Sequence, residues 1–270
     1  MNNNTRGYHF FYRCFWLFSI SCIVSANPLT GDDIAEKIAA RDEGVTQYRR
    51  IHMLMTDSQN NVRERETVSF RKYYGADKKT LIYYEKPANF RDTAFLTFDY
   101  GDVEADDDQW LYLPAFGKIR RISSANRGDA FLGTDFSYED IKKETKFSLS
   151  DYQFTILEHR EESGSSLYLL EAIPVNEQVA NELGISRIRS WIDAQIWMPL
   201  SVDQWDLHGQ HYKTIEIREV QSIQGIWTPL SIVSRNHLTQ HHTVFNFSEI
   251  DYQQQIDDQI FTQNTLRRGL

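Results

Sequence analysis

Cysteine is nearly absent from this chain of 270 residues. The two cysteines, Cys14 and Cys22, both lie close to the N-terminus. Without thiols beyond residue 22, the rest of the chain can form no disulfide, no thiol nucleophile and no cysteine-ligated metal site. Its stability must therefore come from a packed core, which a chain of this length can build.

A surplus of positive charge is also missing. The chain has 29 Lys and Arg residues against 38 Asp and Glu residues, which gives a formal net charge of −9. Such an acidic protein is a poor ligand for nucleic acid or for an anionic membrane surface. We find no motif typical of RNA or DNA binding, so we expect no nucleic-acid partner.

Catalytic motifs are absent as well. The sequence has neither a Gly-x-Ser-x-Gly nucleophile elbow nor a phosphate-binding glycine loop. Its acidic residues are scattered along charged stretches and define no catalytic carboxylate pair. We therefore predict that the protein is not an enzyme and has no cofactor.

Two groups of potential metal ligands need separate consideration. The last third of the chain contains His208, His211, His237, His241 and His242. Three of them together could bind a metal ion, but their spacing fits no known template, and adjacent His241 and His242 would point to opposite faces of a strand. The acidic stretch 99–108 lacks the ligand order of an EF-hand loop. We expect surface histidines, a solvated acidic turn and no metal site.

A long apolar run stands at the N-terminus. Arg6 and Arg13 precede the apolar residues 14–24, and Val24-Ser25-Ala26 places compact residues where a signal peptidase cleaves. The run is too short to span a bilayer as a mature helix. We predict a cleaved signal peptide over residues 1–26 and export from the cytoplasm, with an uncleaved N-terminal anchor as the alternative.

Residues 27–270 contain no linker-like segment, so we expect one domain. Thr30 with Asp33 and Ser137 with Asp140 predict capping boxes that open two helices. The first helix should end near residues 42–44. Residues 176–183, followed by Gly184, predict a third helix.

Short strands dominate the rest of the chain. They are predicted at residues 48–56, 63–74, 80–85, 94–100, 109–113, 118–122, 152–159, 166–173, 187–195, 200–205, 212–220, 230–236 and 243–250. Their close spacing indicates an antiparallel sheet that curls toward a barrel. In residues 63–74 charged residues alternate with Val68 and Phe70, which favours a strand with one wet face.

Several of these strands are apolar on both faces. A lipid chain could fill the space inside such a curved sheet, or the core could be closed without any cavity, and alternation alone decides neither. The residues that we predict to contact a lipid are Ile51, Met53, Met55, Tyr83, Phe95, Trp110, Tyr112 and Trp191. Arg120 and Arg121 point to opposite faces, so one can point inward, or they can form a surface ion pair with the acidic stretch.

The central segment carries a resemblance to a known family. The runs DQWLYLPAFGKIRRI (108–122), FLGTDFSYEDI (131–141) and KPANFRDTAFL (86–96) closely resemble the LolA-like family of outer-membrane lipoprotein-sorting proteins. The resemblance extends over most of residues 27–270. It implies a mainly β (α+β) fold, an unclosed antiparallel β barrel of about eleven strands whose opening is covered by short helices.

The resemblance also implies a function. A protein of this family is expected to be a monomeric periplasmic carrier that binds lipoprotein acyl chains or another lipid in an apolar cavity and moves it toward the outer membrane. The alternative is an accessory subunit of an RND-type envelope exporter that carries no cargo. Neither role implies catalytic residues.

Overall fold

A computed structural model describes residues 28–102, 105, 107–162 and 164–270 of the protein. The predicted signal peptide and its cleavage site lie outside these residues. Within them, no helix is long and apolar enough to cross a membrane.

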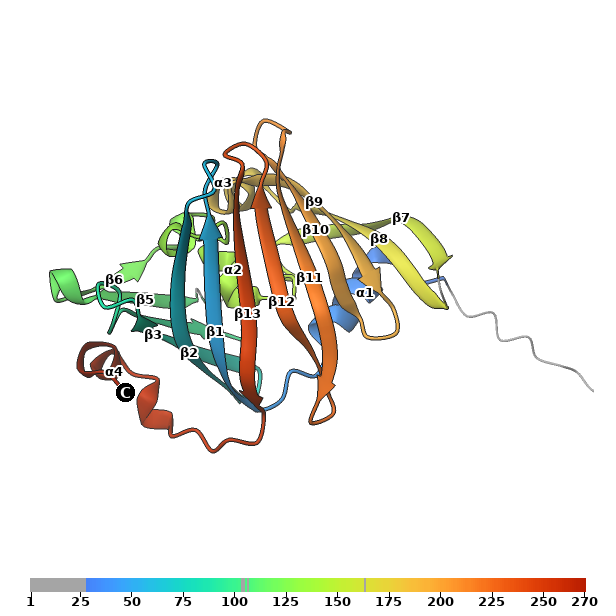
Figure 1. Ribbon diagram of the computed structural model, residues 1–270. Helices are drawn as coiled ribbons and strands as arrows, with labels where there is room; N and C mark the ends of the chain where they lie inside the picture. The colour runs from blue at the N-terminus through green and yellow to red at the C-terminus, as the bar shows by residue number, and fades with distance from the viewer. Residues whose placement is uncertain (1–27, 103–104, 106, 163) are drawn as a thin grey trace, which may run out of the picture.

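The described residues form thirteen strands in one antiparallel sheet (Figure 1). The strands are β1 (Thr46–Thr56), β2 (Val62–Tyr74), β3 (Asp77–Lys86), β4 (Ala94–Asp99), β5 (Asp108–Leu113), β6 (Lys118–Ile122), β7 (Tyr152–Glu162), β8 (Ser165–Pro174), β9 (Ile185–Asp193), β10 (Met198–Asp206), β11 (His211–Ile223), β12 (Ile226–Asn236) and β13 (His241–Asp251). Each of the predicted strand ranges overlaps one of them.

Most neighbouring strands of the sheet follow each other directly in the chain. The first strand, β1, and the last strand, β13, pair with each other in the middle of the sheet. The strand order is β6-β5-β4-β3-β2-β1-β13-β12-β11-β10-β9-β8-β7, so only β1 and β13 are neighbours that do not follow each other in the chain. β6 and β7 remain as free edges of an unclosed barrel that curls around helix α2 (Tyr138–Lys143) (Figure 1). The predicted fold class is confirmed, with thirteen strands where about eleven were expected.

The predicted helix starts are confirmed by their caps. Helix α1 (Gly31–Ala39) opens with a capping box between Thr30 and Asp33, and α2 opens with one between Ser137 and Asp140. α1 ends at Ala39, before the predicted residues 42–44. The third helix, α3 (Glu177–Leu183), ends at Gly184, whose φ of 70° suits a residue without a side chain.

Helix α1 packs on the inner face of the sheet, near strands β7 to β9. Ile34 and Ile38 are fully buried against Leu170 of β8 and Ile192 of β9. This packing buries the apolar stripe of a nine-residue helix, which would not be stable in water alone.

The side of β2 that carries Arg65 and Arg71 faces the inside of the barrel, so the predicted wet face of this strand is wrong. Arg65 and Arg71 are 5% and 3% exposed. They share the inner face with Ile51 and Met53, because Met53 pairs with Arg65 and Ile51 pairs with Thr67. Strand alternation gives the residues that share a face, but the position of the core decides which face is buried.

The outer face of β3 to β6 is covered by the C-terminal segment, residues 252–270. This segment contains the 3-10 helix η4 (Asp258–Ile260) and helix α4 (Gln263–Arg268), neither of which was predicted. Ile256, Phe261 and Leu266 are buried there against outer-face residues such as Leu81 and Leu96. Strands β3 to β6 are therefore apolar on both faces, because the core covers their inner face and the C-terminal segment covers their outer face.

Candidate functional site: a cavity between the inner sheet face and helix α2

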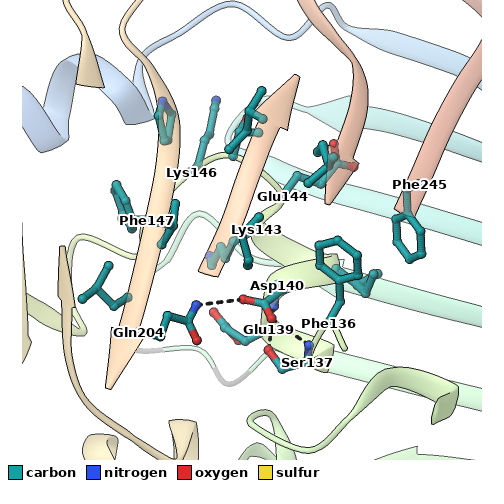
Figure 2. Close-up of a pocket in the computed structure, with 18 of the residues that line it drawn as sticks. Phe136, Ser137, Glu139, Asp140, Lys143, Glu144, Lys146, Phe147, Gln204 and Phe245 are labelled. Atoms are coloured by element: carbon teal, nitrogen blue, oxygen red, sulfur yellow. Dashed lines mark hydrogen bonds between the residues drawn. The ribbon is translucent and has the colours of Figure 1, made fainter. Parts of the chain in front are cut away.

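An apolar cavity of about 90 Å³ lies between the inner face of the sheet and the segment that contains α2 (Figure 2). Its apolar wall comes mainly from inward-pointing residues of seven strands: Ile51, Ile82, Ile185, Ile188, Val202, Ile215, Ile217, Ile232, Phe245 and Phe247. Phe136, Ile141 and Phe147 complete this wall from the α2 side.

Aromatic contacts hold the residues around α2 inside the barrel. The ring of Phe136 stacks on Phe245 of β13, with 4.4 Å between the ring centroids. Tyr138 contacts Phe95 of β4 and Phe131, at centroid distances of 5.6 and 5.5 Å. Stacked and edge-to-face pairs at these distances add to the energy of simple burial, so α2 is a packed part of the core.

A buried ion pair fixes the first turn of α2 to strand β11. Lys213 Nζ lies 2.6 Å from Asp140 Oδ2. Gln204 donates a 3.3 Å hydrogen bond to Asp140 Oδ1 (Figure 2). Burial would raise the pKa of Asp140, but the Lys213 ammonium and the hydrogen bonds from Ser137 outweigh it and lower that pKa. Asp140 also closes the capping box of α2, so one carboxylate both caps the helix and anchors it.

Charged residues dominate the other end of the cavity. Lys143, the last residue of α2, lines the cavity together with Glu144 and Lys146, which follow the helix (Figure 2). Arg49 of β1 also lines it. Arg49 forms a bidentate contact with Glu144, at 2.7 and 3.2 Å. The cavity therefore has an apolar interior and an ionic end.

A second, polar cleft of about 450 Å³ adjoins this ionic end. Lys143, Lys146, Phe147 and Ser148 line both the cavity and the cleft. Segment 143–148 thus separates an apolar space from a polar one, an arrangement that suits a molecule with an apolar tail and a polar head.

Four of the eight predicted lipid-contacting residues lie on the inner face. Ile51 lines the cavity. Met53 and Phe95 belong to the same core cluster as Ile51, and both are fully buried. Met55 is buried two residues further along β1. The structure therefore brings Ile51, Met53 and Phe95 together in the core around the cavity.

The other four lie on the outer face. Tyr83, Trp110 and Tyr112 pack against the C-terminal segment, and Trp191 lies under the guanidinium of Arg160, 3.9 Å from its ring centroid. The cavity wall instead contains late-strand residues such as Ile215 and Phe245, which sequence reasoning missed. Their regular alternation gave a signal, but it did not tell which face was inside.

Other sequence predictions concern the surface. Arg121 forms an ion pair with Asp108 of the acidic stretch, as one of the two alternatives predicted. The acidic turn is less solvated than predicted, because Asp99 and Asp107 form ion pairs with Lys143 and Lys142. Of the late histidines, His211 and His237 contact each other, with 4.6 Å between their ring centroids.

The fold is shared with solved structures. A DUF1329 family protein from Desulfovibrio piger has a TM-score of 0.79 at 26% sequence identity, over 87% of this chain and 97% of that chain. A domain named as a candidate outer-membrane lipoprotein-sorting protein from Vibrio parahaemolyticus has a TM-score of 0.78 at 29% identity, over 88% and 98% of the two chains. A LolA superfamily protein from Nitrosomonas europaea, at 18% identity and a TM-score of 0.66 over 88% and 99%, shares the fold.

Sequence comparison agrees with the structural likeness. No curated protein matches the chain. A family model, described only as that of an uncharacterized protein, matches residues 76–268, which is more than half of the chain. The chain therefore belongs to this family of uncharacterized proteins. It shares its fold with a DUF1329 family protein, with a candidate outer-membrane lipoprotein-sorting domain and with a LolA superfamily protein.

Proposed function

We propose that this protein is a periplasmic carrier that binds the acyl chain of a lipoprotein or of another lipid in its apolar cavity and moves it toward the outer membrane. The observation that carries the proposal is the apolar cavity between the inner sheet face and α2. The likeness to a candidate lipoprotein-sorting domain supports it. In this role the protein is a monomer and performs no chemical reaction.

The size of the cavity sets what it can hold. One water molecule needs about 10–15 Å³ of cavity, so about 90 Å³ accommodates a short section of an acyl chain. Each methylene group removed from water contributes about 0.8 kcal/mol, so six of them contribute about 5 kcal/mol.

Native mass spectrometry of the protein purified from a periplasm tests the proposal, with extraction of any bound lipid. We expect a co-purifying acyl species and binding of a fluorescent fatty-acid probe. The Val202→Phe variant fills the cavity wall, so it should weaken probe binding at least tenfold. The matched control is Val62→Phe, at a position that is 54% exposed and does not line the cavity, and it should bind the probe normally.

A clean apo mass together with no probe binding would contradict the carrier function. That outcome would favour the accessory subunit of an RND-type exporter, which carries no cargo. Equal probe binding by Val202→Phe and wild type would place the lipid outside this cavity.

A further inference from the structure

The ionic end of the cavity belongs to a larger buried charge cluster, of which Arg49, Glu144 and Lys146 line the cavity. Among the described residues, four cations (Arg41, Arg49, Arg71 and Lys146) share two carboxylates (Glu43 and Glu144) in five ion pairs of 2.7 to 3.8 Å. Arg49 and Arg71 are 6% and 3% exposed. Buried cations need counter-charges, because water does not solvate them there.

The ionisation of the cluster agrees with this surplus. Burial would raise the pKa of Glu43, but Arg71, Lys78, Lys146 and Arg41 lower it well below the usual range. Burial also lowers the pKa of Lys146, and the attraction of Glu43 does not compensate for it. The lowered pKa of Glu43 shows that the surrounding cations stabilise a negative charge in this cluster.

The guanidinium groups retain unused hydrogen-bond donors. The Nε atoms of Arg41, Arg49 and Arg71 are buried and have no hydrogen-bond partner among the described residues. Arg49 also lies over the ring of Phe247, 4.3 Å from its centroid, and both residues line the cavity. The donors of Arg49 therefore lie at the boundary between the apolar wall and the ionic end.

Glu144 occupies this boundary in an unfavourable backbone conformation. It caps α2 with φ 55° and ψ −107°, a region that residues with side chains rarely adopt. Such strain is kept where surrounding contacts hold it, and it collects at ligand sites. Here the bidentate contact with Arg49 and the 3.8 Å contact with Arg71 hold the carboxylate in place.

We propose that the cavity selects amphiphiles with an anionic head group, a carboxylate or a phosphate, and that this head group binds Arg49 in the position that the Glu144 carboxylate occupies here. The tail lies along the apolar wall, and Arg71 comes within reach once Glu144 is displaced. Arginine forms paired hydrogen bonds with both head groups. This inference rests on the proposed lipid-binding function and names the head group of its ligand.

Calorimetric titration with four twelve-carbon probes tests the inference at pH 7.5, below their micellar concentrations. The probes are dodecanoate, dodecyl phosphate, dodecanol and dodecyltrimethylammonium, and inorganic phosphate serves as a fifth ligand without a tail. Because hydrogen bonds to charged groups are stronger than those to neutral groups, dodecanoate and dodecyl phosphate should each bind at least about tenfold more tightly than dodecanol. Inorganic phosphate alone should bind far more weakly than dodecyl phosphate.

Two variants with opposite effects separate head-group recognition from a structural role. Arg49→Gln should remove the preference for anions and leave the affinity for dodecanol unchanged. Glu144→Gln removes the competing carboxylate, so it should bind dodecyl phosphate more tightly than wild type does. The matched controls are Arg121→Gln and Glu162→Gln, which change the same charges at exposed positions and should alter neither affinity.

The possible results are distinguishable. Equal binding of all four tailed probes overturns the head-group inference and leaves the carrier function standing. Failure of every tailed probe to bind contradicts both. Binding of inorganic phosphate as tight as that of dodecyl phosphate also overturns the inference, because the site would then bind a free anion. If Arg49→Gln does not fold, the wild-type comparison and Glu144→Gln decide the question.

Discussion

The ion pair between Lys213 and Asp140 should contribute strongly to stability, because it joins α2 to β11 inside the protein. Lys213 is 3% exposed, and its ammonium lies 2.6 Å from the carboxylate. Removing one partner of a buried pair leaves an uncompensated charge and costs about 3–5 kcal/mol. We therefore expect Lys213→Met to lower the melting temperature by about 6–20 °C for a domain of this size.

The effect should depend on pH in a defined direction. In the wild type the pKa of Asp140 is lowered and that of Lys213 is raised. The carboxylate's contribution is therefore present above its unfolded pKa of about 3.9, and the ammonium's contribution is present below about 10.4. Between about pH 5 and pH 10 the wild type retains the full contribution of the pair.

The variant should behave differently within that window. Without Lys213, burial raises the pKa of Asp140, so the variant loses stability as the pH rises through that value. The stability difference from wild type should therefore be smaller at pH 5 than at pH 8. Urea unfolding at both pH values, followed by circular dichroism, measures this difference.

The result that would refute the reasoning is a loss below about 1 kcal/mol at pH 8, as is typical of exposed pairs. Arg121→Met provides that comparison, because Arg121 pairs with Asp108 and its side chain is 61% exposed. The double variant Lys213→Met with Asp140→Asn should recover much of the lost stability, because no unpaired charge remains.

Three further changes test the packing. Leu266→Ala should lower the free energy of unfolding in urea by about 2–5 kcal/mol, because Leu266 is fully buried on the outer sheet face. As a control, Leu270→Ala, at a position that is 57% exposed, should change it by less than about 0.5 kcal/mol. Gly31→Ala should lower the melting temperature although alanine favours helices, since the new Cβ would lie 2.3 Å from the carbonyl oxygen of Phe154; a stabilised variant would contradict this contact. Phe136→Ala should cost about 3–5 kcal/mol through loss of its stacked, buried ring. A calorimetric loss below about 1 kcal/mol would contradict a stabilising role for the Phe136–Phe245 contact.

Local features of the fold could be predicted from the sequence because local forces determine them. The capping boxes at Thr30 and Ser137 depend on residues three positions apart. Gly184 ends α3 because its backbone adopts a left-handed conformation. The strand ranges follow from alternation and turn residues, and the runs 108–122 and 131–141 indicated the LolA-like family.

The candidate site depended on information that alternation does not contain. Tyr83 and Tyr84 are adjacent in β3, yet Tyr84 is in the inner core and Tyr83 contacts the C-terminal segment. Strands that are apolar on both faces suggested a lipid-binding cavity. In β3 to β6, however, the outer face is apolar because residues 252–270 pack against it. An apolar face in a strand does not show whether a lipid or another segment of the chain covers it.

The sequence by itself therefore determined the strands, the three predicted helices, the absence of cysteine after residue 22 and the family. Only the tertiary structure decided which strand faces surround the cavity, and it placed Arg49 and Arg71 inside the barrel with Ile51. The physical reason is that a strand's two faces are set by its own residues, whereas burial is set by what the other strands, α2 and the C-terminal segment bring against each face.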